Sequence, residues 1–516
     1  MRALLAIAQA DFRERVRRTS FLVLLAAALA VVYGYVPPRS AAYVTFSFGN
    51  TRGLYNSAWV GVLVSILDMV VFSLLGFYVV RDAVERDERT GVGQILATTP
   101  MTRVQYTLGK FLSNTAVLGC AAGVTLVMAA VMQQVRGEVR HLDVVQLCLP
   151  FLFLVVPGVA LVAATAVVFE TFRLLRGVKG SVLYFFLWIA VLTIPVAQAA
   201  SGHQKPWLDP LGWSTPMSDI QTSVRAHFPD YNGGVNAGVT VSRTPMRTFL
   251  WEGEEWAPVA PWRLFWLLVA VAVAAAAAVP FHRFDPERMP RRTTTGRTAP
   301  GRAARSLRRR WTPLFERLAS RSAGLTLLWA EWGLLVRGRR MGWGVVALGL
   351  WVACLLSPLE LVRRTLLPVA WLWPLAAWAE MGNHEARHRT EALVFVCPHP
   401  LGRQLPAAYG AGVFLSALLG SSAAVRFLAA RDWPALAAWA VGACFVPALA
   451  LALGALSGGP RLFEITYLLV WYAGLLNRLP LFDFLASGTG PTVGFLAATL
   501  ALLCVATLAR AGRLRS

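Results

Sequence analysis

Two histidines and a glutamate stand at a spacing that can bind a catalytic metal. His384, Glu385 and His388 match the pattern H-E-x-x-H. On a helix this spacing places two imidazoles one turn apart for zinc and leaves the glutamate as a general base. In a membrane setting the pattern would indicate an intramembrane zinc protease. The same segment occurs elsewhere in the chain with Val84 and Glu88 at the histidine positions, so zinc chemistry stays a remote alternative.

What repeats in this segment is a set of charges, a threonine and a proline. The first copy contains Glu85, Arg89, Thr90, Pro100 and Arg103, and the same residue types recur 300 residues later without a gap, as Glu385, Arg389, Thr390, Pro400 and Arg403. A Glu and an Arg four residues apart can pair on one face of a helix, for about half a kcal/mol at most. Pairing alone is a weak reason to repeat them, so we expect a shared function.

An apolar stripe lies between the charges and the proline in each copy. It consists of Val92, Ile95 and Leu96 in the first copy and of Ala392, Phe395 and Val396 in the second. This i, i+3, i+4 spacing predicts a short helix with one apolar edge, which the proline ends. Such a helix could seat in a groove of a partner protein and transmit its movement; a surface helix without a partner is the alternative. We call residues 85–103 the first handle and residues 385–403 the second handle.

The composition of the chain requires a membrane, because 56% hydrophobic residues and a mean hydropathy of +0.55 exceed what soluble domains contain. Stretches of about 20 apolar residues can cross a bilayer as helices. Such stretches begin near twelve positions: Phe21, Trp59, Phe111, Val144, Val182, Trp262, Trp343, Leu366, Ala407, Trp433, Phe463 and Val493. The sequence therefore predicts about twelve spans, and each handle follows the second span of its half.

Basic residues predict the orientation, because Arg and Lys stay in the cytoplasm when they flank short loops. By this rule both termini, both handles and the connection after the sixth span lie inside, and residues 201–261 lie outside. The connection from His282 to Met341 alone holds fifteen arginines against four acids. Topology and anionic lipid head groups thereby account for the net charge of +22, so we expect membrane lipids and no nucleic acid as partners.

A second duplicated element precedes the first span of each half. Ala10, Asp11, Phe12, Val16 and Arg17 are echoed by Ala330, Glu331, Trp332, Val336 and Arg337. Its mixture of apolar and basic residues is typical of a helix that lies in the membrane interface. What repeats is thus cytoplasmic, whereas the outer residues 201–261 have no counterpart. Six spans per half give both halves the same orientation, and a repeated inner surface predicts a two-fold partner.

Asp68 lies near the middle of the second predicted span. A carboxylate is costly at that depth and is by default a functional hint. A position on the substrate path is one interpretation, and a hydrogen bond to a polar group on a neighbouring helix is the other.

These features together resemble a type-2 ATP-binding-cassette (ABC) exporter permease. The first handle reads E-R-D-E-R-T-G-V-G-Q-I-L-A-T-T-P-M-T-R and is followed by Leu108, Gly109 and Lys110, as in that family. The second handle reads E-A-R-H-R-T-E-A-L-V-F-V-C-P-H-P-L-G-R, which is more degenerate and lacks the Gly-Lys pair. The resemblance covers nearly the whole chain and is stronger in the first half.

The resemblance implies export of a substrate, driven by ATP hydrolysis on two copies of a separate cytosolic ATPase subunit that docks on the handles. ATP and Mg²⁺ would be bound by that subunit, and no cofactor by this chain. The sequence contains no G-x-x-x-x-G-K-[ST] loop, so we expect a permease and not an enzyme. The ATPase-coupling residues would be Glu85, Arg89, Thr90, Ile95, Leu96, Pro100, Arg103, Glu385, Arg389, Thr390, Phe395, Val396, Pro400 and Arg403.

An ion-gradient-driven secondary transporter of the major facilitator type is the main alternative. That class also has two parallel six-span halves and a basic central connection. It needs neither the interfacial helices, nor the repeated handles, nor a large outer insert, and its charge-rich Gly-Asp-Arg loop does not occur in this sequence.

The predicted fold is an all-α polytopic membrane protein with two parallel six-helix repeats, each with an N-terminal interfacial helix and a cytosolic coupling helix. The predicted domains are a first permease half (1–283, with the outer insert 201–261), a basic cytosolic linker (284–320) and a second permease half (321–516). Arginine outnumbers lysine by 46 to three, which fits a GC-rich bacterium. We therefore expect its plasma (inner) membrane as the location.

Overall fold

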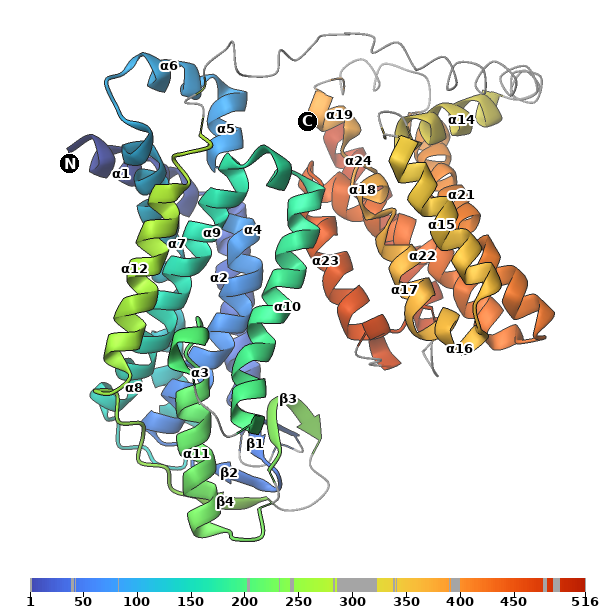
Figure 1. Cartoon of the computed structure of the whole chain (residues 1–516). Coiled ribbons are helices and arrows are strands. Elements are labelled where there is room, and N and C mark those ends of the chain that lie inside the picture. Colours follow the sequence, from blue (N-terminus) through green and yellow to red (C-terminus); the bar gives the residue numbers. More distant parts are fainter. Residues whose placement is uncertain are drawn as a thin grey trace. The chain divides into compact units, whose positions relative to one another are not determined.

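The computed structural model of the chain divides into two compact units, Met1–Thr293 (unit 1) and Thr294–Ser516 (unit 2) (Figure 1). It describes residues 2–38, 41, 43–81, 83–201, 205–231, 233–241, 246–281, 284, 323–336, 339, 341–388, 390, 400–476, 480–485 and 492–515. Arg389, Phe395 and Val396 of the second handle lie outside the described residues, as does all of the predicted linker except Phe284.

Unit 1 is a bundle of apolar helices with a small sheet at one end (Figure 1). In chain order the helical elements are α1 (Arg2–Val16), α2 (Thr19–Tyr35), α3 (Ser57–Val71), the π-helical turn η1 (Phe72–Gly76), α4 (Phe77–Val80), α5 (Ala83–Thr90), α6 (Val92–Thr98), α7 (Arg103–Arg136), α8 (Val144–Pro150), η2 (Phe151–Val155), α9 (Val156–Thr171), η3 (Arg173–Leu175), α10 (Val178–Ser201), η4 (Pro206–Leu208), α11 (Ser214–His227) and α12 (Ala260–Ala276).

Polar side chains fix where two of the long helices begin. Asn56 accepts a hydrogen bond from the backbone amide of Trp59 (2.8 Å) at the start of α3. Thr102 and Gln105 form a reciprocal capping box at the start of α7. Both caps satisfy N–H groups that lack a partner in the first helical turn. The helix that follows the first handle therefore starts at a defined residue.

Seven helices in the described part of the chain are long and apolar enough to cross a membrane: Ser57–Glu88, Arg103–Arg136, Val144–Thr171, Val178–Pro195, Leu401–Ala429, Trp433–Ser457 and Thr492–Arg513. The bent pair Leu4–Val16 and Phe21–Tyr35 would add an eighth, and Ala260–Ala276, Gly324–Val336 and Gly342–Leu356 are shorter apolar helices. All twelve predicted span starts fall within helices. The all-α polytopic class is confirmed, and the count of twelve spans stays a prediction.

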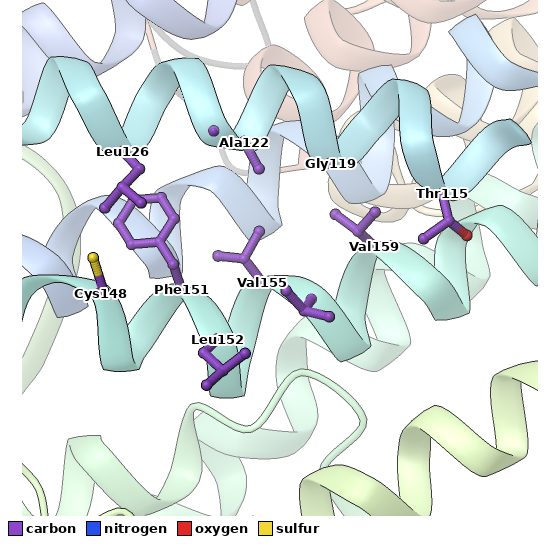
Figure 2. Close-up of a pocket in the computed structure, with 11 residues that line it drawn as sticks. Thr115, Gly119, Ala122, Leu126, Cys148, Phe151, Leu152, Val155 and Val159 are labelled. Atoms are coloured by element: carbon purple, nitrogen blue, oxygen red, sulfur yellow. The ribbon is translucent and has the colours of Figure 1, made fainter. Parts of the chain in front are cut away.

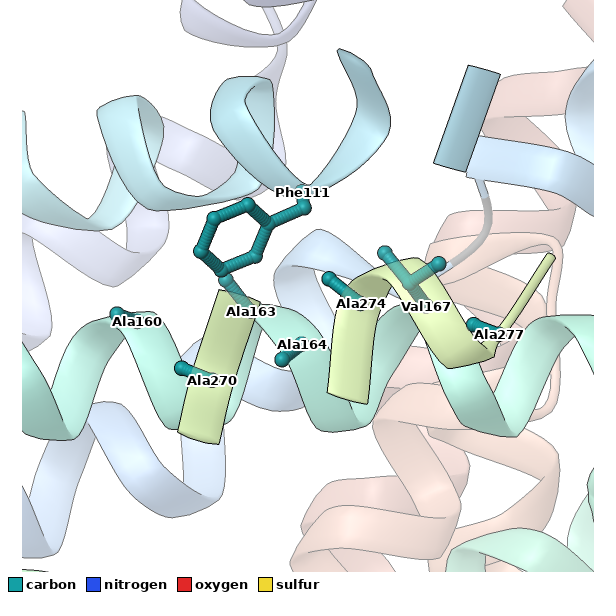
Figure 3. Packing of buried hydrophobic residues seen from close by; sticks show 8 residues of the cluster. All are labelled: Phe111, Ala160, Ala163, Ala164, Val167, Ala270, Ala274 and Ala277. Carbon is teal, nitrogen blue, oxygen red and sulfur yellow. The ribbon is translucent and has the colours of Figure 1, made fainter. Parts of the chain in front are cut away.

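Small side chains allow α12 to pack closely on α9 (Figure 3). The buried cluster between α7, α9 and α12 consists of Phe111, Ala160, Ala163, Ala164, Val167, Ala270, Ala274 and Ala277. Lipid tails are as apolar as these side chains, so helices in a membrane associate through close packing and not through a hydrophobic drive. The alanines supply that packing, and they hold α12 against α9.

The sheet at the end of unit 1 joins two segments that are far apart in the sequence. Its strands are β1 (Tyr43–Phe48), β2 (Thr51–Gly53), β3 (Val235–Val241) and β4 (Arg247–Phe249), in the order β3-β1-β2-β4. β1 pairs antiparallel with β2 and β3, and β2 pairs parallel with β4. We call residues 43–53 and 205–259 the cap. The predicted architecture did not include these strands.

Aromatic rings form the core of the cap around Trp59, at the start of α3. The ring of Trp59 lies 5.3 Å from that of Phe46, 5.9 Å from that of Phe249 and 6.2 Å from that of Trp251. A Cβ at Gly53 would meet the Trp59 ring at 2.3 Å, so only glycine lets β2 approach this closely. The cap is therefore packed directly onto a long helix of the bundle.

Unit 2 is helical throughout its described elements. These are α14 (Ala323–Val336), α15 (Met341–Leu356), α16 (Leu359–Leu361), η5 (Val362–Leu366), α17 (Leu367–Leu372), α18 (Leu375–Trp378), α19 (His384–His388), α21 (Pro400–Ala429), α22 (Trp433–Ser457), α23 (Arg461–Trp471), η6 (Tyr472–Leu476), η7 (Pro480–Phe482) and α24 (Thr492–Arg515). Leu405 of α21, Leu451 and Ala452 of α22 and Ala506 of α24 share one buried cluster. The last helix of the chain thereby packs into the body of unit 2.

Glu254 gives the cap a pH-dependent stability. One of its carboxylate oxygens is buried and has no hydrogen-bond partner among the described residues. Burial raises the pKa of Glu254 to about 7 from an ordinary value of 4.5, and the charges of Asp219 and Glu255 add to the increase. Because the folded-state pKa is the higher one, folding favours the protonated carboxyl. This contribution is complete below about pH 4.5 and is lost as the pH rises through about 7.

We predict that Glu254→Gln stabilises the cap at pH 8 by about 1 kcal/mol after allowance for solvent screening, and has little effect at pH 5. Glutamine keeps the shape of the neutral acid and cannot ionise. The measurement is the rate of limited proteolysis in the cap at the two pH values, in detergent. Glu252→Gln, an exposed acid of the same loop, is the control. Equal pH dependence in the wild type and in Glu254→Gln would refute the assignment.

Candidate functional site

The first handle forms two short helices, α5 and α6, at the end of unit 1 opposite to the cap (Figure 1). Gly91 joins them with a φ of 80°, in the left-handed region that glycine adopts without steric cost. α6 ends at Thr98, two residues before Pro100, and α7 begins at Arg103. The predicted helix, proline turn and following span therefore occur in the predicted order.

The predicted coupling residues of the first handle lie mostly on its surface. Glu85, Thr90, Pro100 and Arg103 are exposed, and the Thr90 hydroxyl donates to the carbonyl of Arg86 (2.9 Å). Two apolar side chains of α6 are also exposed, Ile95 by 67% and Val92 by 43%. Leu96 is half-buried beneath them. Arg89 lies in α5, but its side chain is outside the described residues.

A buried carboxylate ties the base of the first handle to the rest of unit 1. Asp11 of α1 accepts hydrogen bonds from the ammonium of Lys110 (2.8 Å) and the hydroxyl of Ser113 (2.7 Å), both on α7. It also forms ion pairs with Arg15, one turn further along α1, and with Arg86 of α5. Three helices therefore meet at one carboxyl group.

A second carboxylate continues the network within the handle. Asp87 of α5 accepts from the hydroxyl of Tyr106 (2.7 Å) and lies 2.9 Å from the ammonium of Lys110, both on α7. On the other side of α5, Glu88 pairs with Arg176 at 2.9 Å. The handle is thereby fixed to the helices on both sides of it.

The network keeps Asp11 ionised. Burial raises the pKa of this carboxyl, but the charges of Arg15 and Lys110, with the hydrogen bonds from Lys110 and Ser113, outweigh burial and hold its pKa well below 3.8. A buried ion pair gives little net stability against an apolar replacement of both partners. Removing one partner is different, because it leaves an uncompensated buried charge and destabilises by about 3–5 kcal/mol.

Helix α1 meets the bundle through its polar face. Ala8, Asp11 and Arg15 are its buried residues, whereas Leu5 is exposed. A Cβ at Gly109 of α7 would lie 3.2 Å from the side chain of Ile7, so glycine permits the close approach that brings Lys110 to Asp11. α1 and α2 are bent by 69°. The face of α1 toward the bundle thus contains the ionic residues Asp11 and Arg15 together with Ile7 and Ala8, and the exposed face contains Leu5.

The second handle is held by a different set of side chains. Glu385 of α19 pairs with Arg510 of α24 (2.5 Å) and accepts a hydrogen bond from Gln404 of α21 (2.8 Å). Gln404 also donates to Glu331 of α14 (3.3 Å). The Thr390 amide donates to the carbonyl of Glu385 (3.0 Å). Pro400 begins α21, and Arg403 on the same helix is exposed.

Glu385, which would be the general base of a zinc site, has other partners in the structure. The Glu385 carboxylate is already bound by Arg510 and Gln404. The described residues contain no group of three or more His, Cys, Asp and Glu side chains placed to hold a metal ion. The side chain of His388 lies outside the described residues.

Asp68 lies within α3. It is 1% exposed and accepts a hydrogen bond from the Thr125 hydroxyl of α7 (2.5 Å). Figure 2 shows a groove of about 440 Å³ between α7 and the helices α8 and α9. Its walls are almost entirely apolar, and Asp68 is not among its lining residues. The role of Asp68 in a substrate path stays a prediction.

Comparison with known families gives a decisive match. The family described as ABC-2 family transporter protein matches residues 5–285, more than half of the chain. The chain belongs to this family. The protein is therefore a multi-pass membrane permease of an ABC transporter, and the members of this family are transmembrane components without an ATPase domain of their own. The match contains the first handle and the Asp11 network and does not reach the second handle. A search of curated proteins found no match.

Sequence reasoning missed two members of this permease's ionic network. Arg86 and Asp87 lie inside the first handle, between the residues that recur in the second handle. Because Arg86 and Asp87 do not recur in the second handle, the comparison of the two copies did not identify them. Two signals pointed to their partners, namely the recurrence of an acid at position 11 and the Gly-Lys pair that ends in Lys110. The contact among the four became visible only in the folded chain.

We predict that Asp11→Asn lowers the free energy of unfolding of the permease by about 3 kcal/mol, because it leaves Lys110 and Arg86 without their shared carboxylate. The measurement is the apparent melting temperature in detergent by fluorescence-detected size exclusion. Asp230→Asn is the matched control, since this exposed acid pairs with Arg247 at the surface of the cap and its loss should amount to about 1 kcal/mol or less. If the two variants melt alike, the Asp11 network does not hold the handle.

Proposed function

We propose that this permease exports its substrate with energy from ATP hydrolysis on two copies of a separate cytosolic ATPase subunit, which dock on the two handles. The observation that carries the proposal is the exposed apolar edge of α6. Ile95 and Val92 are exposed, while the helix that precedes them is fixed by buried ionic contacts. An exposed apolar edge on a fixed base favours a protein partner that covers it.

The energetics support docking at this edge. Full burial of an isoleucine side chain contributes about 2 kcal/mol, and Ile95 is only one-third buried in the free permease. Because α5 is fixed to α1 and α7, displacement of a docked subunit would move these helices as well, in the manner of rigid-body coupling. In this proposal ATP and Mg²⁺ are bound by the ATPase, and this chain binds neither.

The two docking sites are unequal in this proposal. Glu85 is exposed on the first handle, whereas Glu385 is paired with Arg510 and largely buried. We therefore place the stronger contact at the first handle. The basic flanks favour a cytoplasmic position for both handles and both termini. The composition favours the plasma (inner) membrane of a bacterium, among anionic lipids.

We predict that a tagged wild-type permease, purified in mild detergent, captures an ATPase subunit at two copies per chain, and that Ile95→Asp reduces this capture by about tenfold or more, because a charge replaces the apolar contact. The Glu85→Ala, Glu385→Ala double variant should lose capture as well. Intact-complex mass spectrometry measures the stoichiometry. Gln94→Glu adds a charge beside the edge without removing an apolar side chain, and it serves as the control.

If no ATPase is captured under any nucleotide condition, the coupling proposal is wrong. Transport that follows a proton gradient would then indicate a secondary transporter. Zinc bound at His384 and His388 would instead indicate metal chemistry.

A further inference from the structure

The segment just after α12, the last long helix of unit 1, contacts the first handle through aromatic side chains. Phe281 and Phe284 lie beyond the end of α12 and are buried. The Phe281 ring stacks on Tyr106 of α7 at 4.8 Å, and the Phe284 ring meets Tyr106 edge-on at 5.5 Å. Val84 and Met101 complete the buried cluster, with Leu96 of α6 packed against it.

Phe284 lies directly under α6. A Cβ at Gly93 would meet the Phe284 ring at 2.6 Å, so α6 rests on this ring through the bare backbone of a glycine. Phe284 also has a φ of 58°, an unfavourable conformation for a bulky residue that persists only where surrounding contacts enforce it. The chain thus bends after α12 to place this ring beneath the handle.

The second handle also contacts the last helix of its own unit. Arg510, on α24, forms the ion pair with Glu385 and donates a hydrogen bond to Gln404 (2.8 Å). The Arg510 side chain is 7% exposed and that of Glu385 is 14% exposed. The contact is therefore desolvated, and removal of one partner would leave an uncompensated buried charge, which costs more than the loss of a surface pair.

We propose that each handle is latched to the last membrane helix of its own unit, by Phe284 in unit 1 and by Arg510 in unit 2. These are positioning residues, which set the resting angle of the handle and pass its displacement to α12 and α24. The last helix thereby joins α1 and α7 as a path for movement in unit 1. The inference rests on the proposed function for what pulls the handle, but the latches themselves need no ATPase.

The alanine packing makes α12 suited to this role. Ala270, Ala274 and Ala277 hold it against α9 at close range. A push on Phe284 therefore moves a helix that is packed along its length, and the displacement reaches the opposite end of unit 1, where the cap lies (Figure 1). In unit 2 the corresponding helix α24 packs on α22 through Ala506 and Leu451.

Hydrogen–deuterium exchange of the purified full chain in lipid nanodiscs, without ATPase, tests both latches. Phe284→Ala should speed amide exchange in residues 95–98 of α6 by about tenfold or more, because the ring that holds the helix is removed. Exchange in α9 should not change, and Phe284→Leu should restore most of the protection. Phe265→Ala, which removes an exposed ring from α12 itself, is the control and should leave α6 unchanged.

The second latch is tested in the same way. Arg510→Gln should speed exchange in residues 384–388 by about tenfold, and Arg510→Lys should recover part of the protection. Arg431→Gln, which removes the charge of an exposed arginine in unit 2, is the control. Unchanged exchange in α6 and α19 would overturn the latches whatever the ATPase experiment gives, whereas loss of protection without any captured ATPase would keep the latches and refute only the motor.

Discussion

Asp11 is a buried carboxylate that stays ionised because Arg15, Arg86 and Lys110 surround it. These cations come from three helices, the interfacial helix, the handle and the span that follows the handle. Movement of any one of the three away from the others would break an ion pair in a desolvated site. The ionic contacts therefore hold the three helices together, so that they move as one rigid body. Helices α5 and α6, with eight and seven residues, could not be stable by themselves, because isolated helices this short are marginal in water.

In unit 2, different residues attach the second handle to the neighbouring helices. Glu331 occupies the position that corresponds to Asp11, yet its partner is the neutral amide of Gln404, and the cation at the second handle comes from α24. An amide can accept from one side and donate to another, so Gln404 connects Glu331, Glu385 and Arg510. The second handle is consequently tied to the last helix by charge, whereas the first is tied to it by aromatic packing. The handle is thus duplicated in the sequence, but the side chains that hold it differ between the two units.

The sequence predicted those features that depend on local pattern. The apolar runs predicted the long helices, and the i, i+3, i+4 stripe predicted α6. The proline predicted the break before α7. Features that depend on distant pairing were missed. β1 pairs with a strand about 190 residues away, Tyr43 opposite Val241, and no local signal specifies such a partner. The buried face of α1 was also missed, because Asp11 and Arg15 look like surface residues until Lys110 is placed beside them.

One contact shows how far the duplication extends into the fold. In unit 1 Gly109 brings the third span against Ile7 of the interfacial helix, and in unit 2 Gly410 brings α21 against Leu328 of α14 at 3.0 Å from a would-be Cβ. In the register of the handles, however, Gly410 corresponds to Lys110 and not to Gly109. The glycine has taken the place of the lysine, so the close approach recurs without the cation that accompanied it. A charge for the second handle then had to come from another helix, and Arg510 of α24 is the residue that reaches it.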